Sequence, residues 1–330
     1  MPKVCSAPEG CDRETIARNL CQKHYKQWLR KGARVQAPPT LSGGDEYDAA
    51  WLKFCEFIGT RRRREAQAVP EPLTSRTRYG AVSDLHVPFH DEGAVMEAIE
   101  HLRSQGVTRL IVGGDFLDCY SLSRFTQYES VPIRSEFVAA RVLLDYFSRT
   151  FSKVIVIEGN HEAREKKYLA AKLPPDLLDW FLDASIMQRL SRDMPNVEIV
   201  TRTVANTSVA WLAQMGRDCI VGHPEVSSRV LLKPVDTFRQ WLNEWHETIG
   251  LARPRLVIIG HTHQAGMAWA GQTLLVENGC LCLNQGYALQ PNLYPKPQRL
   301  ACTMFDQIDG VTDPNSVRQF FPRCALLRVA

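Results

Sequence analysis

Five short apolar runs in the chain are each followed, within a few residues, by an Asp, Asn or His side chain. The runs are too short for amphipathic helices and have glycine at or near their ends, which indicates buried β-strands. They lie at residues 81–82, 110–112, 154–157, 219–221 and 256–259. Parallel strands gather their carboxyl ends at one edge, where open α/β sheets bind ligands. We therefore expect these polar side chains to meet at one site.

Segments with apolar residues at three- and four-residue spacing lie before and between the runs and predict helices. They span 45–64, 94–103, 137–151, 166–190 with a break at Pro174-Pro175, and 230–246 after a break at Pro234. Strand and turn are expected at 198–209, a hairpin around Gly271, and at least one strand in the tail at 301–330, near 324–327. The alternation of strands and helices predicts an α/β sandwich.

Length and composition set the class of protein. The 330 residues are enough for one large domain and a small second unit. The net charge of +4 is too small to indicate a nucleic-acid partner by itself. No apolar stretch approaches the length of a membrane span, and the N-terminus lacks the apolar core of a signal peptide. We expect a cytoplasmic protein, in the host cytoplasm if phage-encoded, with no membrane partner and with reduced cysteines.

The polar residues after the strands form five ordered motifs. They are Asp84-x-His86, Gly114-Asp115-x-x-Asp118, Gly159-Asn160-His161-Glu162, Gly222-His223 and Gly260-His261-x-His263. In order and type they resemble the motifs of the calcineurin-like metallophosphoesterase superfamily, of the phage and bacterial type. The resemblance covers about residues 76–270. It implies a four-layer α/β/β/α sandwich and hydrolysis of phosphoester bonds by a metal-bound hydroxide.

A two-metal site needs several carboxylates and imidazoles, and one ligand that bridges the cations. Asp115 is the best bridge because its carboxylate has two oxygens. The resemblance implies two further groups of ligands, one for each cation: Asp84, His86 and His263 for the first, and Asn160, His223 and His261 for the second. Such ligands without a thiolate favour Mn²⁺, with Fe, Zn²⁺ or Mg²⁺ as alternatives.

Two further residues are predicted to be catalytic. His161 directly follows Asn160, and we expect it to protonate the leaving alkoxide. The resemblance implies that Asp118 orients His161 and favours its charged form. Arg164 could contact a substrate phosphate, although an arginine on a helix is more often solvated. His90 could line the same pocket, whereas we assign no role to two histidines in amphipathic helices, His101 and His246.

The same motifs argue against some substrates. Protein Ser/Thr phosphatases of this fold carry Arg-Gly after the second Asp of the Gly-Asp motif, where this chain has Cys119-Tyr120. They also carry His-Gly-Gly where this chain has His223-Pro224-Glu225. Glu162 stands where many nucleases and cyclic-nucleotide phosphodiesterases of the superfamily have Asp. A phosphoprotein substrate is therefore disfavoured, and a close match to those nuclease and phosphodiesterase branches is in doubt.

Residues 1–32 contain four residues spaced for a closed tetrahedral zinc site: Cys5, Cys11, Cys21 and His24. The stretch resembles small zinc modules at the ends of phage and bacterial DNA-associated proteins. Seven Lys or Arg oppose three Asp or Glu in it, and the cations alternate with Tyr25 and Trp28. The module could therefore bind nucleic acid, or its aromatics could cover the zinc while the cations are solvated. The other seven cysteines are expected to pack in the core.

The predicted organisation is a zinc module at 1–32, a linker with a helix at 33–75, and a metallophosphoesterase domain at 76–330. The favoured function is a nuclease targeted to DNA or RNA by the zinc module. A phosphodiesterase or phosphatase acting on small nucleotides is the first alternative. A nucleic-acid- or protein-binding adaptor with an inactive phosphoesterase fold is the second. The sequence leaves the oligomeric state open.

Overall fold

The computed structural model describes residues 76–124, 130–174, 177–178, 184–204, 207–282 and 298–323. The predicted zinc module, the linker with its helix, and the strand near 324–327 lie outside these residues. Within them, no helix combines the length and apolar character needed to cross a bilayer.

The first sheet has six strands, in the order β13-β12-β1-β2-β3-β4. Their bounds are β1 (Arg76–Val82), β2 (Arg109–Gly113), β3 (Lys153–Ile157), β4 (Val197–Ile199), β12 (Cys302–Ile308) and β13 (Val311–Phe320). Strands β1 to β4 run parallel, and β12 and β13 extend the sheet as an antiparallel pair beside β1.

The second sheet has five strands, in the order β10-β11-β9-β8-β7. They are β7 (Leu212–Met215), β8 (Cys219–Gly222), β9 (Leu256–Ile259), β10 (Ala265–Ala270) and β11 (Thr273–Asn278). Strands β8, β9 and β11 run parallel, and the antiparallel β10–β11 pair is the hairpin predicted around Gly271. A separate two-stranded hairpin consists of β5 (Arg202–Val204) and β6 (Thr207–Val209).

The helices differ in detail from those predicted. They are α3 (Glu92–Ser104), the 3₁₀-helix η1 (Tyr120–Leu122), α4 (Ile133–Thr150), α5 (Ala163–Ala170), α7 (Ile186–Leu190) and α8 (Lys233–Trp245). Residues 230–232 lie before α8, so the break predicted near Pro234 falls at the start of the helix, where the missing N–H of a proline is tolerated. Helix α5 ends at Ala170, before the predicted break, and α7 begins anew with a capping box of Ser185 and Gln188.

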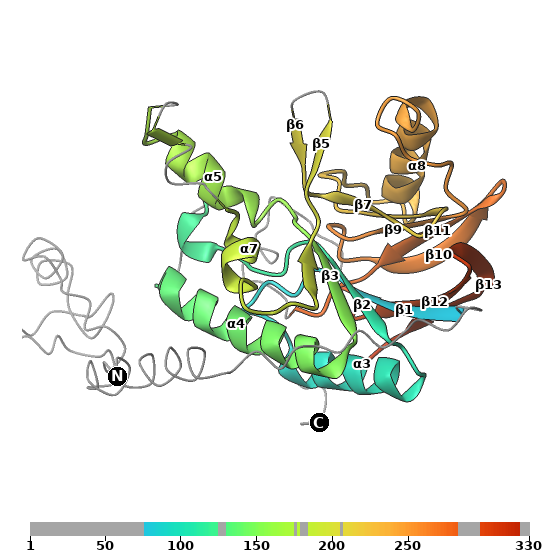
Figure 1. The fold of residues 1–330 in the computed structure, drawn as a ribbon, viewed down its shortest axis with the longest axis horizontal. Helices are drawn as coiled ribbons and strands as arrows, with labels where there is room; N and C mark the ends of the chain where they lie inside the picture. The colour runs from blue at the N-terminus through green and yellow to red at the C-terminus, as the bar shows by residue number, and fades with distance from the viewer. Residues whose placement is uncertain are drawn as a thin grey trace, which may run out of the picture. The chain divides into compact units, whose positions relative to one another are not determined.

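Three hydrophobic clusters separate four layers and confirm the predicted α/β/β/α sandwich. The first lies between the six-stranded sheet and helices α3 and α4, the second between the two sheets, and the third between the five-stranded sheet and α8. Figure 1 shows α3 and α4 on one side of the sheets and α8 on the other. Successive side chains of a strand alternate between neighbouring clusters, as Leu110 and Ile111 do on β2. Both faces of these strands are buried, so each is an unbroken apolar run rather than an alternating one.

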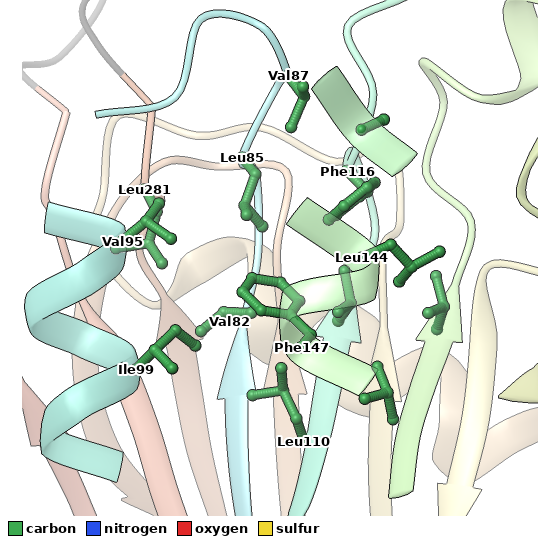
Figure 2. Close-up of a cluster of buried hydrophobic side chains, with 14 of the residues drawn as sticks. Val82, Leu85, Val87, Val95, Ile99, Leu110, Phe116, Leu144, Phe147 and Leu281 are labelled. Atoms are coloured by element: carbon green, nitrogen blue, oxygen red, sulfur yellow. The ribbon is translucent and has the colours of Figure 1, made fainter. Parts of the chain in front are cut away.

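The cluster under α3 and α4 supports the loops that carry the site residues. Phe147 of α4 and Phe116 of the loop after β2 are fully buried, with ring centroids 6.2 Å apart. Figure 2 shows these rings together with Leu85 of the loop after β1, Val95 of α3 and Leu144 of α4. Because Leu85 and Phe116 belong to the polar motifs, packing in this core also fixes the backbone on which those motifs lie.

We predict that Phe147→Ala lowers the free energy of unfolding by about 3–5 kcal/mol, because it leaves a cavity beneath the loops. Val142→Ala, on the same helix but 58% exposed, should change it by less than about 0.5 kcal/mol. Urea unfolding followed by circular dichroism measures both values. Equal effects of the two variants would contradict the assigned core.

Candidate dinuclear metal site

The predicted ligands come from strand ends in both sheets. Asp84 and His86 follow β1, Asp115 follows β2 and Asn160 follows β3, whereas His223 follows β8, and His261 and His263 follow β9. The loops after β1 and β2 are joined by backbone hydrogen bonds. Asp84 N–H donates to the Gly114 carbonyl at 3.0 Å, and His86 N–H donates to the Asp115 carbonyl at 2.9 Å. The site therefore lies where the carboxyl ends of the two sheets meet.

Five of the seven predicted ligands have left-handed backbone conformations. The φ angles are 53° for Asp84, 49° for His86, 49° for Asp115, 76° for His261 and 53° for His263. Such angles are uncommon outside glycine, although Asp, Asn and His adopt them more readily than other residues. Strained backbone of this kind concentrates at functional sites. Here it turns successive side chains of each short loop toward one centre.

The Asp115 carboxylate lies at that centre. One oxygen, Oδ2, lies 3.1 Å from His223 Nε2 and 3.8 Å from His86 Nε2. The other, Oδ1, accepts the His161 backbone N–H at 3.0 Å. Burial opposes ionisation of Asp115, but the neighbouring charges of His161 and His223 hold its pKa well below the usual value. A Cβ on Gly159 would lie 2.1 Å from Oδ1, so only glycine allows the loop after β3 to approach this carboxylate.

Asp84 organises the other side of the site. Both of its carboxylate oxygens lie 3.0 Å from the His261 backbone nitrogen, which donates to them. Its Oδ1 lies 3.3 Å from His263 Nε2. The Nε2 atoms of His263 and His86 lie 3.1 Å apart, and only one of two facing ring nitrogens can donate to the other.

The predicted second group of ligands is also assembled. His261 Nδ1 lies 2.9 Å from Asn160 Oδ1. His223 Nδ1 lies 2.8 Å from the Gly113 carbonyl, which accepts its hydrogen and so directs Nε2 toward Asp115. Burial opposes protonation of His223, but Asp115 and Asp84 raise its pKa to about 10. Burial and the charge of His223 instead lower the pKa of His261 to about 4.

The residues present fit a pair of cations. Among the described residues, three clusters have ligand atoms within 4.8 Å of one another: His86, His263 and Cys282; His86, Asp115 and His161; and Asp115, His223 and His261. Asp115 belongs to two of them, which is the arrangement required of a bridging carboxylate. At these distances the buried carboxylates repel one another, and so do imidazoles that are charged. Bound divalent cations relieve that repulsion. The ligand roles of the seven residues remain predictions, but their side chains do converge.

His161 lies beside this group and contacts Asp118. Its Nδ1 lies 2.9 Å from the Asp118 backbone carbonyl and 3.6 Å from the carboxylate oxygen Oδ1. Burial opposes protonation of His161, but the charge of Asp115 and the hydrogen bond with Asp118 raise its pKa. Asp118 Oδ2 is also 3.3 Å from His86 Nδ1. One carboxylate therefore contacts both the predicted general acid and a predicted metal ligand.

Arg164 does not belong to a solvated helix face. Its side chain is only 17% exposed, and Nη1 donates to the Asp118 carbonyl at 2.8 Å and to Asp118 Oδ1 at 3.1 Å. Its Nη2 lies 2.9 Å from His161 Nε2. His161 lies two residues before α5 and Arg164 is the second residue of that helix, so their proximity depends on how the turn leads into α5.

Sequence reasoning missed three residues around the site. Glu162 accepts the N–H groups of Gly159 at 2.7 Å and Leu117 at 2.8 Å, so it joins the loops after β3 and β2. Gln298 Nε2 lies 2.9 Å from His263 Nδ1. The thiol of Cys282, interpreted only as core packing, lies 4.0 Å from the same nitrogen. Gln298 and Cys282 follow no recognisable motif, whereas Glu162 sits inside one.

Other histidines lie in different surroundings. His101 stacks on Phe320 with ring centroids 3.9 Å apart, and His246 contacts the Asn243 carbonyl at the end of α8. His90 pairs through its backbone with Cys282, which places it near the loop that carries Cys282. The five cysteines among the described residues, Cys119, Cys219, Cys280, Cys282 and Cys302, are free and buried, as expected.

The geometry agrees with the comparison of sequences. A family model described as the calcineurin-like phosphoesterase superfamily domain matches residues 78–291. The chain belongs to this superfamily. The match includes every residue of the site described above except Gln298. No curated protein matches the chain in sequence.

Several solved structures align with most of the chain at low identity. An archaeal phosphodiesterase is 14% identical, covers 74% of this chain and 99% of its own, and has a TM-score of 0.34. YfcE, a phosphoesterase from E. coli, is 14% identical, with 75% and 100% coverage and a TM-score of 0.35. Vacuolar protein sorting 29 from Cryptosporidium parvum is 12% identical, with 75% and 99% coverage and a TM-score of 0.36.

A buried carboxylate supports the loop that carries Asp118. Glu136 of α4 is fully buried, and its two oxygens accept the N–H groups of Tyr120 at 3.2 Å and Ser121 at 3.5 Å. Burial raises its pKa to about 7. The unfolded chain ionises this group near its usual pKa of about 4.3, so the folded state loses stability as pH rises from there to about 7.

We predict that Glu136→Gln removes this loss, because glutamine does not ionise. As pH rises from 4.5 to 7.5, the unsubstituted chain should lose about 1–3 kcal/mol more unfolding free energy than the variant does. Urea unfolding at several pH values measures the shift. Glu247→Gln is the control, since the Glu247 side chain is 87% exposed. If the unfolding free energies of the Glu136 variant and of the unsubstituted chain change with pH in parallel, burial does not raise the pKa of Glu136.

Proposed function

We propose that this protein is a phosphoesterase that uses two divalent metal ions and acts on DNA or RNA as a nuclease. The observation that supports the hydrolase is the Asp115 carboxylate, which is shared by two potential cation clusters and lies beside His161. Family membership supports the same reaction class. The enzymatic alternative is a phosphodiesterase or phosphatase that acts on small nucleotides. The non-enzymatic alternative is a nucleic-acid- or protein-binding adaptor with an inactive phosphoesterase fold.

Each proposed cation has a defined set of residues. Asp84, His86 and His263 would hold one, Asn160, His223 and His261 would hold the other, and Asp115 would contact both. When bound, the two ions neutralise the phosphoester charge and lower the pKa of a water to near neutrality. Mn²⁺ is our first choice because nitrogen and oxygen ligands predominate, with Fe, Zn²⁺ or Mg²⁺ as alternatives.

The protein's own acid is His161. The Asp118 backbone carbonyl accepts from its Nδ1, so the nitrogen that can reach a substrate is Nε2, which lies beside Arg164 Nη2. The raised pKa of His161 favours the charged imidazolium, in which Nε2–H can protonate the leaving oxygen. Arg164 Nη2 is 2.9 Å from Nε2, and two charged donors at this distance repel. An anionic phosphate oxygen that accepts from both groups would relieve the repulsion.

Charge near the site favours a polyanionic substrate. Helix α5 begins two residues after His161 and exposes Lys166, Lys167 and Tyr168. The Lys172 ammonium lies 6.0 Å from the centre of the Tyr168 ring, which is 47% exposed. Cations beside an exposed aromatic ring suit a strand whose phosphates pair with them while a base stacks on the ring.

The N-terminal cluster supports the same substrate class. We propose that Cys5, Cys11, Cys21 and His24 bind one structural Zn²⁺, and that the cations of residues 1–32 bind nucleic acid. The zinc module would then deliver DNA or RNA to the phosphoesterase domain in the cytoplasm.

We predict that His161→Asn lowers kcat for bis(4-nitrophenyl) phosphate by about 10²–10⁴-fold, because a general acid is lost. Asparagine has no imidazole to protonate the leaving oxygen, whereas all the proposed metal ligands remain in this variant. Metal content, measured by mass spectrometry after loading with Mn²⁺, should therefore stay at the unsubstituted level. Asp115→Asn is the contrasting variant, and it should lose both turnover and metal.

A fall in metal content of the His161 variant would make His161 a ligand rather than an acid. Failure of the unsubstituted protein to hydrolyse any ester with Mn²⁺, Fe²⁺, Zn²⁺ or Mg²⁺ would favour the inactive adaptor.

We predict that removal of residues 1–44 lowers kcat/KM on single-stranded DNA or RNA at least tenfold, because the proposed binding module is absent. Turnover of bis(4-nitrophenyl) phosphate should change less than twofold. Steady-state kinetics on a panel of DNA, RNA, cyclic nucleotides and monoesters measures both. Equal loss on nucleic acid and on the small ester would argue against a targeting role, and activity confined to cyclic nucleotides or monoesters would support the small-nucleotide alternative.

A further inference from the structure

The two ring nitrogens of His263 face different surroundings. Nε2 faces the proposed metal site, 3.3 Å from Asp84 Oδ1 and 3.1 Å from His86 Nε2. Nδ1 faces away from these groups and lies 2.9 Å from Gln298 Nε2. Gln298 follows His263 by 35 residues and lies outside all five motifs.

Whether His263 Nε2 binds a cation or a hydrogen determines which hydrogen-bond partner Nδ1 needs. An imidazole that binds a cation through Nε2 carries its hydrogen on Nδ1, and an imidazolium paired with Asp84 carries hydrogens on both nitrogens. In either state Nδ1–H is a donor and needs an acceptor. The amide nitrogen of Gln298 cannot serve, because it is itself a donor.

The orientation of the Gln298 amide resolves the conflict. Its Oε1 is buried and has no hydrogen-bond partner among the residues that the structure describes, whereas Nε2 points at His263. A half-turn of the amide exchanges two atoms of nearly equal size, so the alternative orientation fits the same space. It places Oε1 within hydrogen-bond distance of Nδ1–H and gives that acceptor a partner, while the amide N–H groups take the position that Oε1 occupies now.

We propose that Gln298 is a positioning residue that accepts the Nδ1 hydrogen of His263 through Oε1 and so directs His263 Nε2 toward the first cation. The backbone holds Gln298 in place. Arg299 N–H donates to the His263 carbonyl at 2.9 Å, and Cys280 N–H donates to the Arg299 carbonyl at 3.0 Å. Hydrogen-bond partners of this kind set the tautomer, orientation and basicity of histidine ligands. The inference rests on the metal site of the proposed function.

Cys282 is the competing partner. Its Sγ lies 4.0 Å from the same Nδ1, at the far limit of a hydrogen bond to sulfur, and sulfur is a weak acceptor. Its Sγ also lies within 4.8 Å of ring nitrogens of His86 and His263, so it could instead bind a cation directly. A substitution of Cys282 therefore serves as the matched control.

The test compares three variants of the full-length chain by titration calorimetry of the metal-free protein with Mn²⁺. Gln298→Met keeps the length of the side chain but has no oxygen, and it should weaken binding at one of the two sites by about 10–100-fold. Gln298→Glu keeps an acceptor and has no donor, so it should bind at least as tightly as the unsubstituted chain. Cys282→Ala should stay within threefold of it.

A spectroscopic readout separates the hydrogen bond from the added charge of the glutamate. Long-range proton–nitrogen correlation spectra of the metal-loaded, ¹⁵N-histidine-labelled protein report which ring nitrogen carries hydrogen. One Nδ1–H signal should disappear or shift in Gln298→Met and persist in Gln298→Glu. The thermal midpoint of each metal-free variant shows that the fold is retained.

Each contrary result overturns the proposal in a defined way. Equal weakening by Gln298→Glu and Gln298→Met would mean that Nδ1 accepts a hydrogen from Gln298. Unchanged affinity in Gln298→Met would remove the positioning role, and weakening by Cys282→Ala alone would transfer the role to the thiol. An unsubstituted chain that binds no divalent metal would end this proposal together with the metal centre. A chain that binds metal but hydrolyses no ester would overturn only the proposed function.

Discussion

The arrangement of the molecule depends on one buried carboxylate. Asp115 accepts the backbone N–H of His161 and contacts His223, so it links the loop after β3 of the six-stranded sheet to the loop after β8 of the five-stranded sheet. Three apolar layers hold the sheets and helices together, and the layer beneath α3 and α4 also supports the loops after β1 and β2. The contacts of Asp115 then join loops of the two sheets, since a buried anion requires nearby donors or cations.

Much of the fold was predictable because its strands are buried on both faces. Such strands appear in the sequence as unbroken apolar runs, and all five predicted runs are strands in the structure. At least one strand was expected in the tail, but the positions of β12 and β13 were not predicted, because polar residues such as Thr303, Asp306 and Gln307 interrupt their pattern. Asp306 is nonetheless buried, where it accepts hydrogen bonds from Arg76 and Arg78 of β1. Pairing with a neighbouring strand, invisible to local periodicity, accommodates these polar groups.

The site was predictable to the extent that it follows strand ends. The seven proposed ligands and His161 each lie two to four residues after an apolar run, and the structure brings them together. The residues that orient them were not predictable in the same way. Gln298 contacts His263 from a segment with no motif. Glu136 supports the Asp118 loop from helix α4. Their roles depend on tertiary packing, which spacing along the chain does not encode.

The left-handed backbone of the proposed ligands constrains how this centre can change over evolution. Alanine or a branched residue at Asp84, His86 or Asp115 would remove a ligand and also strain the turn, at a cost of about 1–2 kcal/mol per residue. Asparagine and glycine avoid the strain. A lineage that lost its metals would therefore drift toward Asn and Gly at these positions while keeping its loops intact. The composition of these turns in related chains would record whether selection still acts on metal binding or only on shape.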